Sequence, residues 1–254
     1  MLKKYEKYKF LFSELVKRDF KKKYKRTILG MIWSVLSPLL NVLVLWLIFS
    51  TLYKKDQPHF VIYLFSGTLV MSFYSECTNG CMRALTSNAG IFSKINVPKI
   101  LFLFSKSVQT LINFGLTLII YFVFCLFQHL SFKYAIVLIY PIIMMLIFNM
   151  SVGMILSALF VFFRDIEYLY SIFMLFLNYL SAIFYPVTIV PERYQKLFYI
   201  NPVYVFIKFF RMIMLDTQIP GWQIWALIAF DTAFFLTIGC LMYKKYDHEF
   251  LYYL

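Results

Sequence analysis

Residues 17–53 have the sequence KRDFKKKYKRTILGMIWSVLSPLLNVLVLWLIFSTLY, in which a basic segment is followed by a long apolar one. The apolar part, from Trp33 to Tyr53, contains no charged residue and has the length of about 20 residues that a helix needs to cross a bilayer. Lys and Arg clustered just ahead of such a stretch are typical of a segment held at the cytoplasmic membrane surface. This stretch therefore predicts a membrane protein.

The composition of the whole chain agrees with that prediction. Of its 254 residues, 62% are hydrophobic and 15% are charged, which excludes a water-soluble globular domain. The net charge of +13 would suit a nucleic-acid partner, but eleven Lys and Arg residues lie within residues 1–26, next to the first apolar stretch. We therefore expect membrane lipids as the partner of this basic segment, and no nucleic acid.

Six apolar stretches are long enough to be membrane-spanning helices. They are residues 33–53, 61–82, 101–127, 134–163, 167–185 and 222–243. The segment 186–220 contains four of the eight prolines and several charges, so it predicts a broken, re-entrant helix pair instead of a seventh span. Six spans place both termini on one side, and the distribution of Lys and Arg, eighteen on that side against seven on the other, predicts that it is cytoplasmic.

The expected fold is a single all-α transmembrane domain over residues 1–254. Its parts are an interfacial amphipathic helix in 1–30, five spans in 31–185, external re-entrant helices in 186–220, a sixth span in 222–243 and a cytoplasmic tail in 244–254. Phe12, Leu15, Val16 and Phe20 recur at helical spacing in the first part, as in a helix that lies on a membrane. This helix is either a basic anchor or a docking surface for a cytoplasmic partner, and its sequence suits both.

Residue types that catalyse reactions are scattered along the chain. The three histidines fall in separate loops or the tail, and the four cysteines form neither a metal motif nor a disulfide framework. No Gly-Lys pair occurs, so the phosphate-binding loop of an ATPase is absent from this sequence. We expect no catalytic residue, no metal and no cofactor in this chain, and we expect a separate subunit to supply ATP hydrolysis if ATP drives transport.

Two acids lie inside predicted spans, Glu76 in the second and Asp231 in the sixth. Ionisable groups in the bilayer are costly and are candidates for a functional role, such as proton coupling in a secondary transporter. The alternative is that each one hydrogen-bonds to a neighbouring helix. Both interpretations stay open at the level of sequence.

Several short motifs, taken in their order along the chain, resemble those of one membrane-protein family. They are LVKRDFK at 15–21, KYKR at 23–26, LGMIW at 29–33, Pro38, the loop 88–99, FRDI at 163–166, FYP at 184–186, Pro191 and Asn201-Pro202. In this order the chain resembles the permease subunits of ABC type-2 exporters for lipid-linked polysaccharides, among them the exporters of O-antigen, teichoic acid and rhamnose polysaccharide. The resemblance extends over nearly the whole chain.

The resemblance implies the partners and the place of action. Two copies of the chain would pair with two ATP-binding-cassette subunits, which would bind ATP and Mg. Together they would move a polyprenyl-(pyro)phosphate-linked glycan out of the cytoplasm across the plasma (inner) membrane of a bacterium. The chain itself would be a channel-forming permease and not an enzyme.

The resemblance and the cytoplasmic segments also indicate candidate site residues. Those for docking the ATPase subunit are Arg18, Asp19, Asn88, Gly90, Lys94, Arg164, Asp165 and Glu167. The candidates for binding the lipid head group as it approaches are Lys25 and Arg26. The candidates for the lining of the conduit are Tyr63, Tyr74, Glu76, Tyr179 and Phe184. The candidates for the external gate are Pro186, Pro191, Arg193, Asn201 and Pro202. Two alternatives remain. One is an ABC exporter of a small molecule or drug with the same topology, and the other is a secondary transporter that is coupled to protons through Glu76 and Asp231.

Overall fold

The computed structural model describes residues 2–24, 32–53, 59–92, 94 and 97–253, and these residues form helices and short connections without a β-strand. The long helices are α1 Leu2–Tyr24, α2 Trp33–Tyr53, α3 Phe60–Met82, α5 Ile100–Phe127, α6 Ile139–Phe162, α7 Ile166–Leu180, α9 Pro202–Met214 and α10 Trp222–Tyr246. Shorter ones are α4 Ala84–Phe92, α8 Glu192–Gln195 and the 3-10 turns η2 Ala135–Leu138, η3 Val187–Ile189, η4 Lys196–Ile200 and η5 Glu249–Leu251. The predicted all-α fold is confirmed.

Helices occupy all six stretches that the sequence marks as apolar. Within the described residues, four of them are long and apolar enough to cross a membrane, namely α3, α5, η2 with α6, and α10. A fifth crossing is added if the pair Glu192–Ile200 and Pro202–Met214, which bends by 107°, is taken as one broken span.

One predicted boundary is wrong. The stretch 167–185 forms a helix of 15 residues that ends at Leu180, five residues before the predicted end. Ala182 has a left-handed backbone with φ of 48°, which a continuing right-handed helix does not tolerate. The Ser181 hydroxyl donates to the Leu177 carbonyl at 2.6 Å, so a side chain satisfies one of the last carbonyls of this helix.

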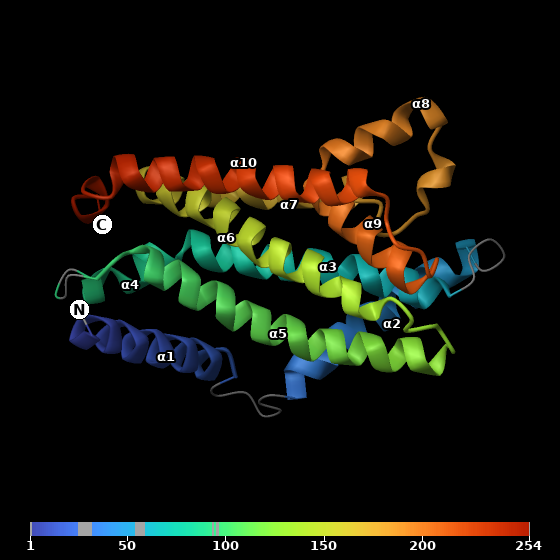
Figure 1. Ribbon diagram of the computed structural model, residues 1–254, viewed down its shortest axis with the longest axis horizontal. Helices are drawn as coiled ribbons and strands as arrows, with labels where there is room; N and C mark the ends of the chain where they lie inside the picture. Colours follow the sequence, from blue (N-terminus) through green and yellow to red (C-terminus); the bar gives the residue numbers. More distant parts are fainter. Residues whose placement is uncertain (1, 25–31, 54–58, 93, 95–96, 254) are drawn as a thin grey trace.

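The helix α3 lies at the centre of the bundle (Figure 1). It packs against α2, α5, α6 and α9, and 72% of its most apolar window is buried, against 22% for α10. The helix α10 packs along α6 on the outside. The proline at position 141 lies in the first turn of α6, where a missing N–H group breaks no helical hydrogen bond.

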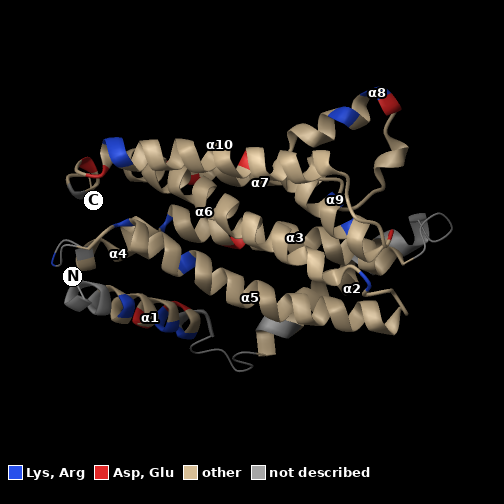
Figure 2. Cartoon of the chain, in the orientation of Figure 1, with Lys and Arg blue, Asp and Glu red and all other residues tan. Residues whose placement is uncertain are grey.

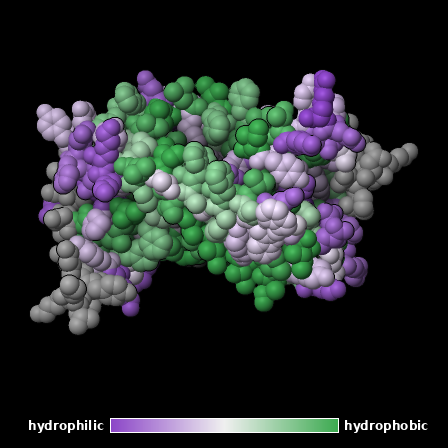
Figure 3. Space-filling view, turned by 45° about the horizontal axis from the view of Figure 1, so that its top comes forward, coloured by the Kyte–Doolittle hydropathy of each residue, from purple (hydrophilic) through white to green (hydrophobic). Residues whose placement is uncertain are grey.

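Charged side chains gather at the two ends of the long axis, and few lie between them (Figure 2). In the space-filling view, hydrophobic surface covers the middle of the molecule and hydrophilic surface lies at both ends (Figure 3). Both chain termini and α4 lie at one end, whereas α8 lies at the other (Figure 1). This distribution is the one that a multi-pass membrane protein requires.

The amino-terminal helix α1 packs against α5. Leu15 is buried, and the ring of Phe12 stacks on that of Phe104 with centroids 5.2 Å apart. The apolar stripe of α1 therefore contacts the bundle itself. The carboxyl-terminal turn also folds back onto the bundle, where Phe250 is fully buried between Phe162 and Tyr243.

Candidate transport cleft and docking surface

A polar stripe runs along one side of α3. Thr68, Ser72, Ser75 and Glu76 recur at spacings of four, three and one residues, which places them on one face of a helix. Ser72 is exposed, and Thr68, Ser75 and Glu76 are half-buried, although α3 is the most buried of the candidate spans. A polar face on a central apolar helix requires a polar surrounding, because burial of unpaired polar groups in hydrocarbon is costly.

That surrounding is a cleft of about 760 Å³ between α2, α3 and α5. Its polar lining consists of Ser37, Asn41, Thr68, Ser72, Ser75, Glu76, Thr110, Asn113, Thr117 and Asn178. Its aromatic lining consists of Trp33, Phe65, Phe73, Phe114 and Phe184. Hydroxyl and amide groups that both donate and accept hydrogen bonds thus face the same space as several aromatic rings.

An amide holds the carboxyl group of Glu76 in place. The Asn113 Nδ2 atom donates to Glu76 Oε1 at 2.7 Å, and Asn113 itself is buried in α5. The Thr117 hydroxyl donates to the Asn113 carbonyl at 3.1 Å, one turn further along α5. The interhelical hydrogen bond that the sequence left as one of two alternatives for Glu76 is therefore present. Asp231 is half-buried on α10 and does not line this cleft.

The predicted conduit residues fall into two groups. Glu76 and Phe184 line the cleft, whereas Tyr63, Tyr74 and Tyr179 do not. The hydroxyl of Tyr63, which is buried, donates to the Tyr185 carbonyl at 2.8 Å. Tyr74 is buried in the core beside a second, apolar cavity of about 340 Å³, and Tyr179 is 59% exposed on α7.

At the end of the molecule that carries α8, Arg211 of α9 is buried, with 7% of its surface exposed. Its guanidinium group donates to the carbonyls of Ala182 at 2.9 Å and of Tyr63 and Ile183 at 3.2 Å. The guanidinium carbon also lies 3.4 Å from the centre of the Tyr63 ring. One side chain thus connects α9, α3 and the segment that follows α7.

The predicted gate residues lie around this connection. Asn201 caps α9 by accepting a hydrogen bond from the Val203 amide at 3.1 Å, and Pro202 occupies the first helical position. The Asn201 amide donates to the Ser181 hydroxyl at 2.9 Å, which links the start of α9 to the end of α7. Pro186 and Pro191 immediately precede η3 and α8, and Arg193 is exposed with its guanidinium group over the Tyr194 ring.

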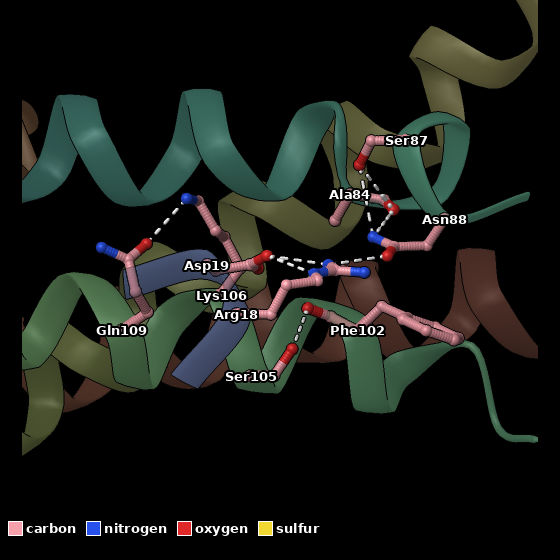
Figure 4. Close-up of polar contacts among 9 residues, drawn as sticks. All are labelled: Arg18, Asp19, Ala84, Ser87, Asn88, Phe102, Ser105, Lys106 and Gln109. Carbon is pink, nitrogen blue, oxygen red and sulfur yellow. Dashed lines mark hydrogen bonds and ion pairs between the residues drawn. The ribbon is translucent and has the colours of Figure 1, made fainter. Parts of the chain in front are cut away.

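At the opposite end, α1 and α4 are joined by two of the residues predicted to dock a partner (Figure 4). Arg18 Nη2 donates to Asn88 Oδ1 at 2.8 Å and to Asp19 Oδ1 at 2.7 Å. Asn88 is buried, and its Nδ2 atom donates to the Ala84 carbonyl at 2.8 Å. The structure therefore gives Asn88 an internal role, because it holds α1 to α4.

A second connection at this end joins the turn after α3 to the start of α7. Arg83 forms an ion pair with Glu167 there. Arg164 and Asp165 are exposed in the turn between α6 and α7, and Gly90 and Lys94 are exposed in and just after α4. Four of the predicted docking residues are thus accessible at one end, whereas Lys25 and Arg26 lie outside the described residues.

The comparisons with known proteins agree with this architecture. Residues 11–215 match the family described as ABC-2 type transporter. The chain belongs to this family. An O-antigen export system permease protein RfbA of Klebsiella pneumoniae is 25% identical over 248 residues, which are 95% of each chain. The protein of the same name in Myxococcus xanthus is 31% identical over 111 residues, which are 44% of this chain and 43% of that protein. The polysialic acid transport protein KpsM of Escherichia coli is 21% identical over 97% of each chain.

This chain is therefore a multi-pass membrane protein of the ABC-2 type transporter family. The relatives that it matches are named as permease or transport proteins. The family implies partnership with ATP-binding-cassette subunits. The predicted resemblance is confirmed by these matches. Among the described residues no group of three or more His, Cys, Asp or Glu side chains is placed to hold a metal ion.

Arg83, Lys99 and Asn113 were not among the candidate site residues, and the structure gives each of them a long-range polar contact. Arg83 pairs with Glu167, Asn113 holds Glu76, and Lys99 Nζ lies 3.1 Å from Asp247 Oδ1 in the carboxyl-terminal turn. A signal for Asn113 was present, because Thr110, Asn113 and Thr117 recur at helical spacing in an otherwise apolar stretch. The two ion pairs join residues 84 and 148 positions apart, and no local pattern connects them.

Proposed function

We propose that this permease moves a polyprenyl-(pyro)phosphate-linked polysaccharide from the cytoplasm across the plasma membrane of a bacterium. The observation that carries the proposal is the cleft of about 760 Å³ in which hydroxyls, amides and aromatic rings face one space within an otherwise apolar bundle. Sugars present hydroxyl groups at their edges and apolar C–H faces, which suit such a mixed lining. The names of the O-antigen and polysialic acid relatives support the same class of cargo.

The proposed topology has six spans, formed by α2, α3, α5, η2 with α6, α7 and α10. Both termini and α4 face the cytoplasm, and the bent pair of α8 with η4 and α9 enters the membrane from outside. The excess of Lys and Arg on the end that carries the termini supports this orientation. The short helix α7 fits a span that is completed by the turn up to Tyr185.

The proposed assembly is a dimer of this chain with two ATPase subunits, which bind ATP and Mg. The cleft of one chain lies between its own helices, and two copies around a twofold axis would join two such clefts into a continuous conduit. The ATPase subunits would contact the exposed residues Gly90, Lys94, Arg164 and Asp165. The connections of Arg18 to Asn88 and of Arg83 to Glu167 would transmit their movement to α1, α3 and α7.

Within this scheme, Lys25 and Arg26 would attract the phosphate groups of the carrier lipid near the first span. The bent pair beyond α7 would gate the outer end, with Asn201 and Arg211 fixing its hinge to the bundle. Opening would then require movement of α9 relative to α3, since Arg211 joins the two.

Purification of the permease from native membranes in mild detergent, followed by mass spectrometry, tests the assembly. We expect a co-purifying subunit with a phosphate-binding loop, and deletion of the permease should leave lipid-linked polysaccharide inside the cell. Transport that collapses with the proton gradient and needs no such subunit would overturn the proposal in favour of a carrier using Glu76 and Asp231. Loss of drug efflux without any retained polysaccharide would instead indicate a small-molecule exporter.

A further inference from the structure

The second cavity, of about 340 Å³, lies beside α7 and has an apolar wall. It is bounded by α3, α6, α7, the start of α9 and α10, and no charged residue is among the described residues that line it. We infer that this cavity binds one acyl chain of an anionic phospholipid, whose head group lies at the end of the molecule that carries both termini. The inference concerns the bilayer around the permease and does not depend on the exported cargo.

The wall of this cavity suits hydrocarbon and not water. Two polar side chains on it are already bonded within the protein: the Tyr170 hydroxyl lies 2.6 Å from the Thr78 hydroxyl, and the Asn201 amide donates to the Ser181 hydroxyl at 2.9 Å. A water molecule in a cavity needs two to four polar partners, whereas an apolar cavity of about 150 Å³ stays dry and holds a benzene ring. This cavity is more than twice that size.

The cavity follows α7 for the depth of about one bilayer leaflet. Ile166, Tyr170, Phe173 and Leu177 line it from α7, and the rise from the first of them to the last is about 16 Å. One leaflet contributes half of a hydrocarbon core of about 30 Å. A single acyl chain therefore matches the cavity in length, whereas the polyprenyl chain of a carrier lipid is several times longer.

The cavity opens sideways, towards the bilayer. Leu169 and Phe173 line it, yet 62% and 50% of their surfaces remain exposed. Val152 and Leu156 of α6 form the opposite wall, which is buried. Because α7 packs mainly against α6, a chain that enters from the side would supply close contacts that this face of α7 lacks.

Two lysines lie at the end of the cavity that faces the termini. Lys244 and Lys245 are exposed at the end of α10 (Figure 2). The hydroxyls of Tyr243 and Ser157 lie 2.6 Å apart, which places these lysines level with Leu159, a residue of the cavity wall in the last turn of α6. Lysines at this depth attract the phosphate group of an anionic lipid.

The turn after α6 adds a third cation. Arg164 is exposed, and its guanidinium carbon lies 5.0 Å from the centre of the Phe160 ring, so the group folds back over α6. A phosphate group beside Leu159 would then meet positive charge from α10 and from this turn. Because the same turn is part of the proposed ATPase contact, the lysines, and not Arg164, separate lipid binding from docking.

Photo-crosslinking locates the acyl chain. The permease, with the subunits that co-purify with it, is reconstituted in phosphatidylethanolamine vesicles that contain phosphatidylglycerol with a diazirine at the end of one acyl chain. We expect cross-links to Phe173 and Leu177 about tenfold more often than to Ile119, the gain from burying about two further CH₂ groups. Ile119 is 61% exposed on α5 and does not line the cavity. Equal cross-linking of the two regions would overturn the inference, because lipid would then only coat the surface.

Val152→Phe tests the cavity itself, because the larger side chain fills space at its buried wall. Added phosphatidylglycerol should raise the melting temperature of the wild type by binding to the folded protein, and it should leave that of Val152→Phe unchanged. Val123→Phe is the matched control and should respond like the wild type, because Val123 is 41% exposed on α5 and does not line the cavity. An equal response of Val152→Phe and the wild type would overturn the inference.

Lys244→Gln combined with Lys245→Gln tests the head group without altering the cavity wall. Each lysine near a membrane surface strengthens the binding of an anionic lipid about fivefold, so the pair should account for a preference of about 25-fold for phosphatidylglycerol over phosphatidylethanolamine. We expect the double variant to lose this preference, measured by competition between the two lipids for the photo-crosslinking site.

The matched control for the head group is Lys133→Gln combined with Lys196→Gln, which removes two exposed lysines from the opposite end of the molecule. This control should keep the preference for phosphatidylglycerol. An equal loss of preference in both double variants would overturn the inference, as would the recovery of a polyprenyl chain instead of phosphatidylglycerol from the cavity.

Discussion

At the scale of single residues, Arg211 connects three parts of the fold through bonds to neutral acceptors. Replacing it by Met removes the donors for the carbonyls of Tyr63, Ala182 and Ile183, all inside the protein. Unsatisfied buried carbonyls are costly, so we expect Arg211→Met to lower the melting temperature of the purified permease by about 5 °C. A thermal scan in detergent measures this change.

The matched control is Arg193→Met, which removes the same charged group from an exposed position on α8. Its melting temperature should stay within about 1 °C of the wild type, because exposed cations add little to stability. An equal shift for both variants would show that charge, and not the buried hydrogen bonds, is what matters at Arg211.

At the scale of helices, close packing of α3 on α6 depends on a glycine. A Cβ atom at Gly153 would lie 2.4 Å from the Cβ atom of Cys81 on α3, which is closer than two carbon atoms can approach without a clash. Gly153→Ala therefore forces the two helices apart, and we expect it to lower the free energy of unfolding by about 2 kcal/mol. A lower melting temperature of the purified variant would report this loss. Gly115→Ala on α5 is the control, since nothing lies within 4 Å of its Cβ position. Equal tolerance of both substitutions would contradict the close contact.

The contact of α1 with α4 predicts a coupled effect on transport. Arg18→Ala and Asn88→Ala each break the bond between these helices, which measures 2.8 Å. We expect each variant to reduce polysaccharide export about fivefold, and the double variant to be no worse than either alone, because both changes remove one interaction. Export relative to ATPase rate is the measurement. Lys17→Ala is the control, because Lys17 pairs with Glu14 within α1. Additive losses in the double variant would contradict the prediction that Arg18 and Asn88 act through one shared hydrogen bond.

At the scale of the whole molecule, the polar cleft and the apolar outer surface should differ in their access to water. In a Cys240→Ser background we expect Ser72→Cys to react with a water-soluble maleimide about tenfold faster than Ile119→Cys, because thiolate forms poorly in hydrocarbon. Ile119 is 61% exposed on α5 and does not line the cleft, so it faces lipid in the proposed topology. The measurement is the labelling rate in intact membranes. Similar rates at both positions would mean that the cleft holds no water.

Much of the element-level description followed from the sequence. Apolar stretches long enough to span a bilayer are local features, and helices occur in all six of them. The sequence analysis placed Asn201 and Pro202 at the external gate, and the structure shows that they also cap α9. The early end of α7 at Leu180 was not predicted from the sequence. Ala182 has a left-handed backbone there, and its carbonyl accepts a hydrogen bond from Arg211, which lies 29 positions further along the chain.

The sequence by itself determined the class of protein, its helices, the absence of an ATP-binding loop and the family resemblance. Only the tertiary structure decided which face of α3 opens into the cleft, that Glu76 and Phe184 line it while Tyr63 and Tyr74 do not, and that Arg18 meets Asn88. The physical reason is that a helix apolar on nearly all sides has no preferred inward face in its own sequence. Its rotation, and so the partners of its few polar residues, is set by packing against helices far along the chain.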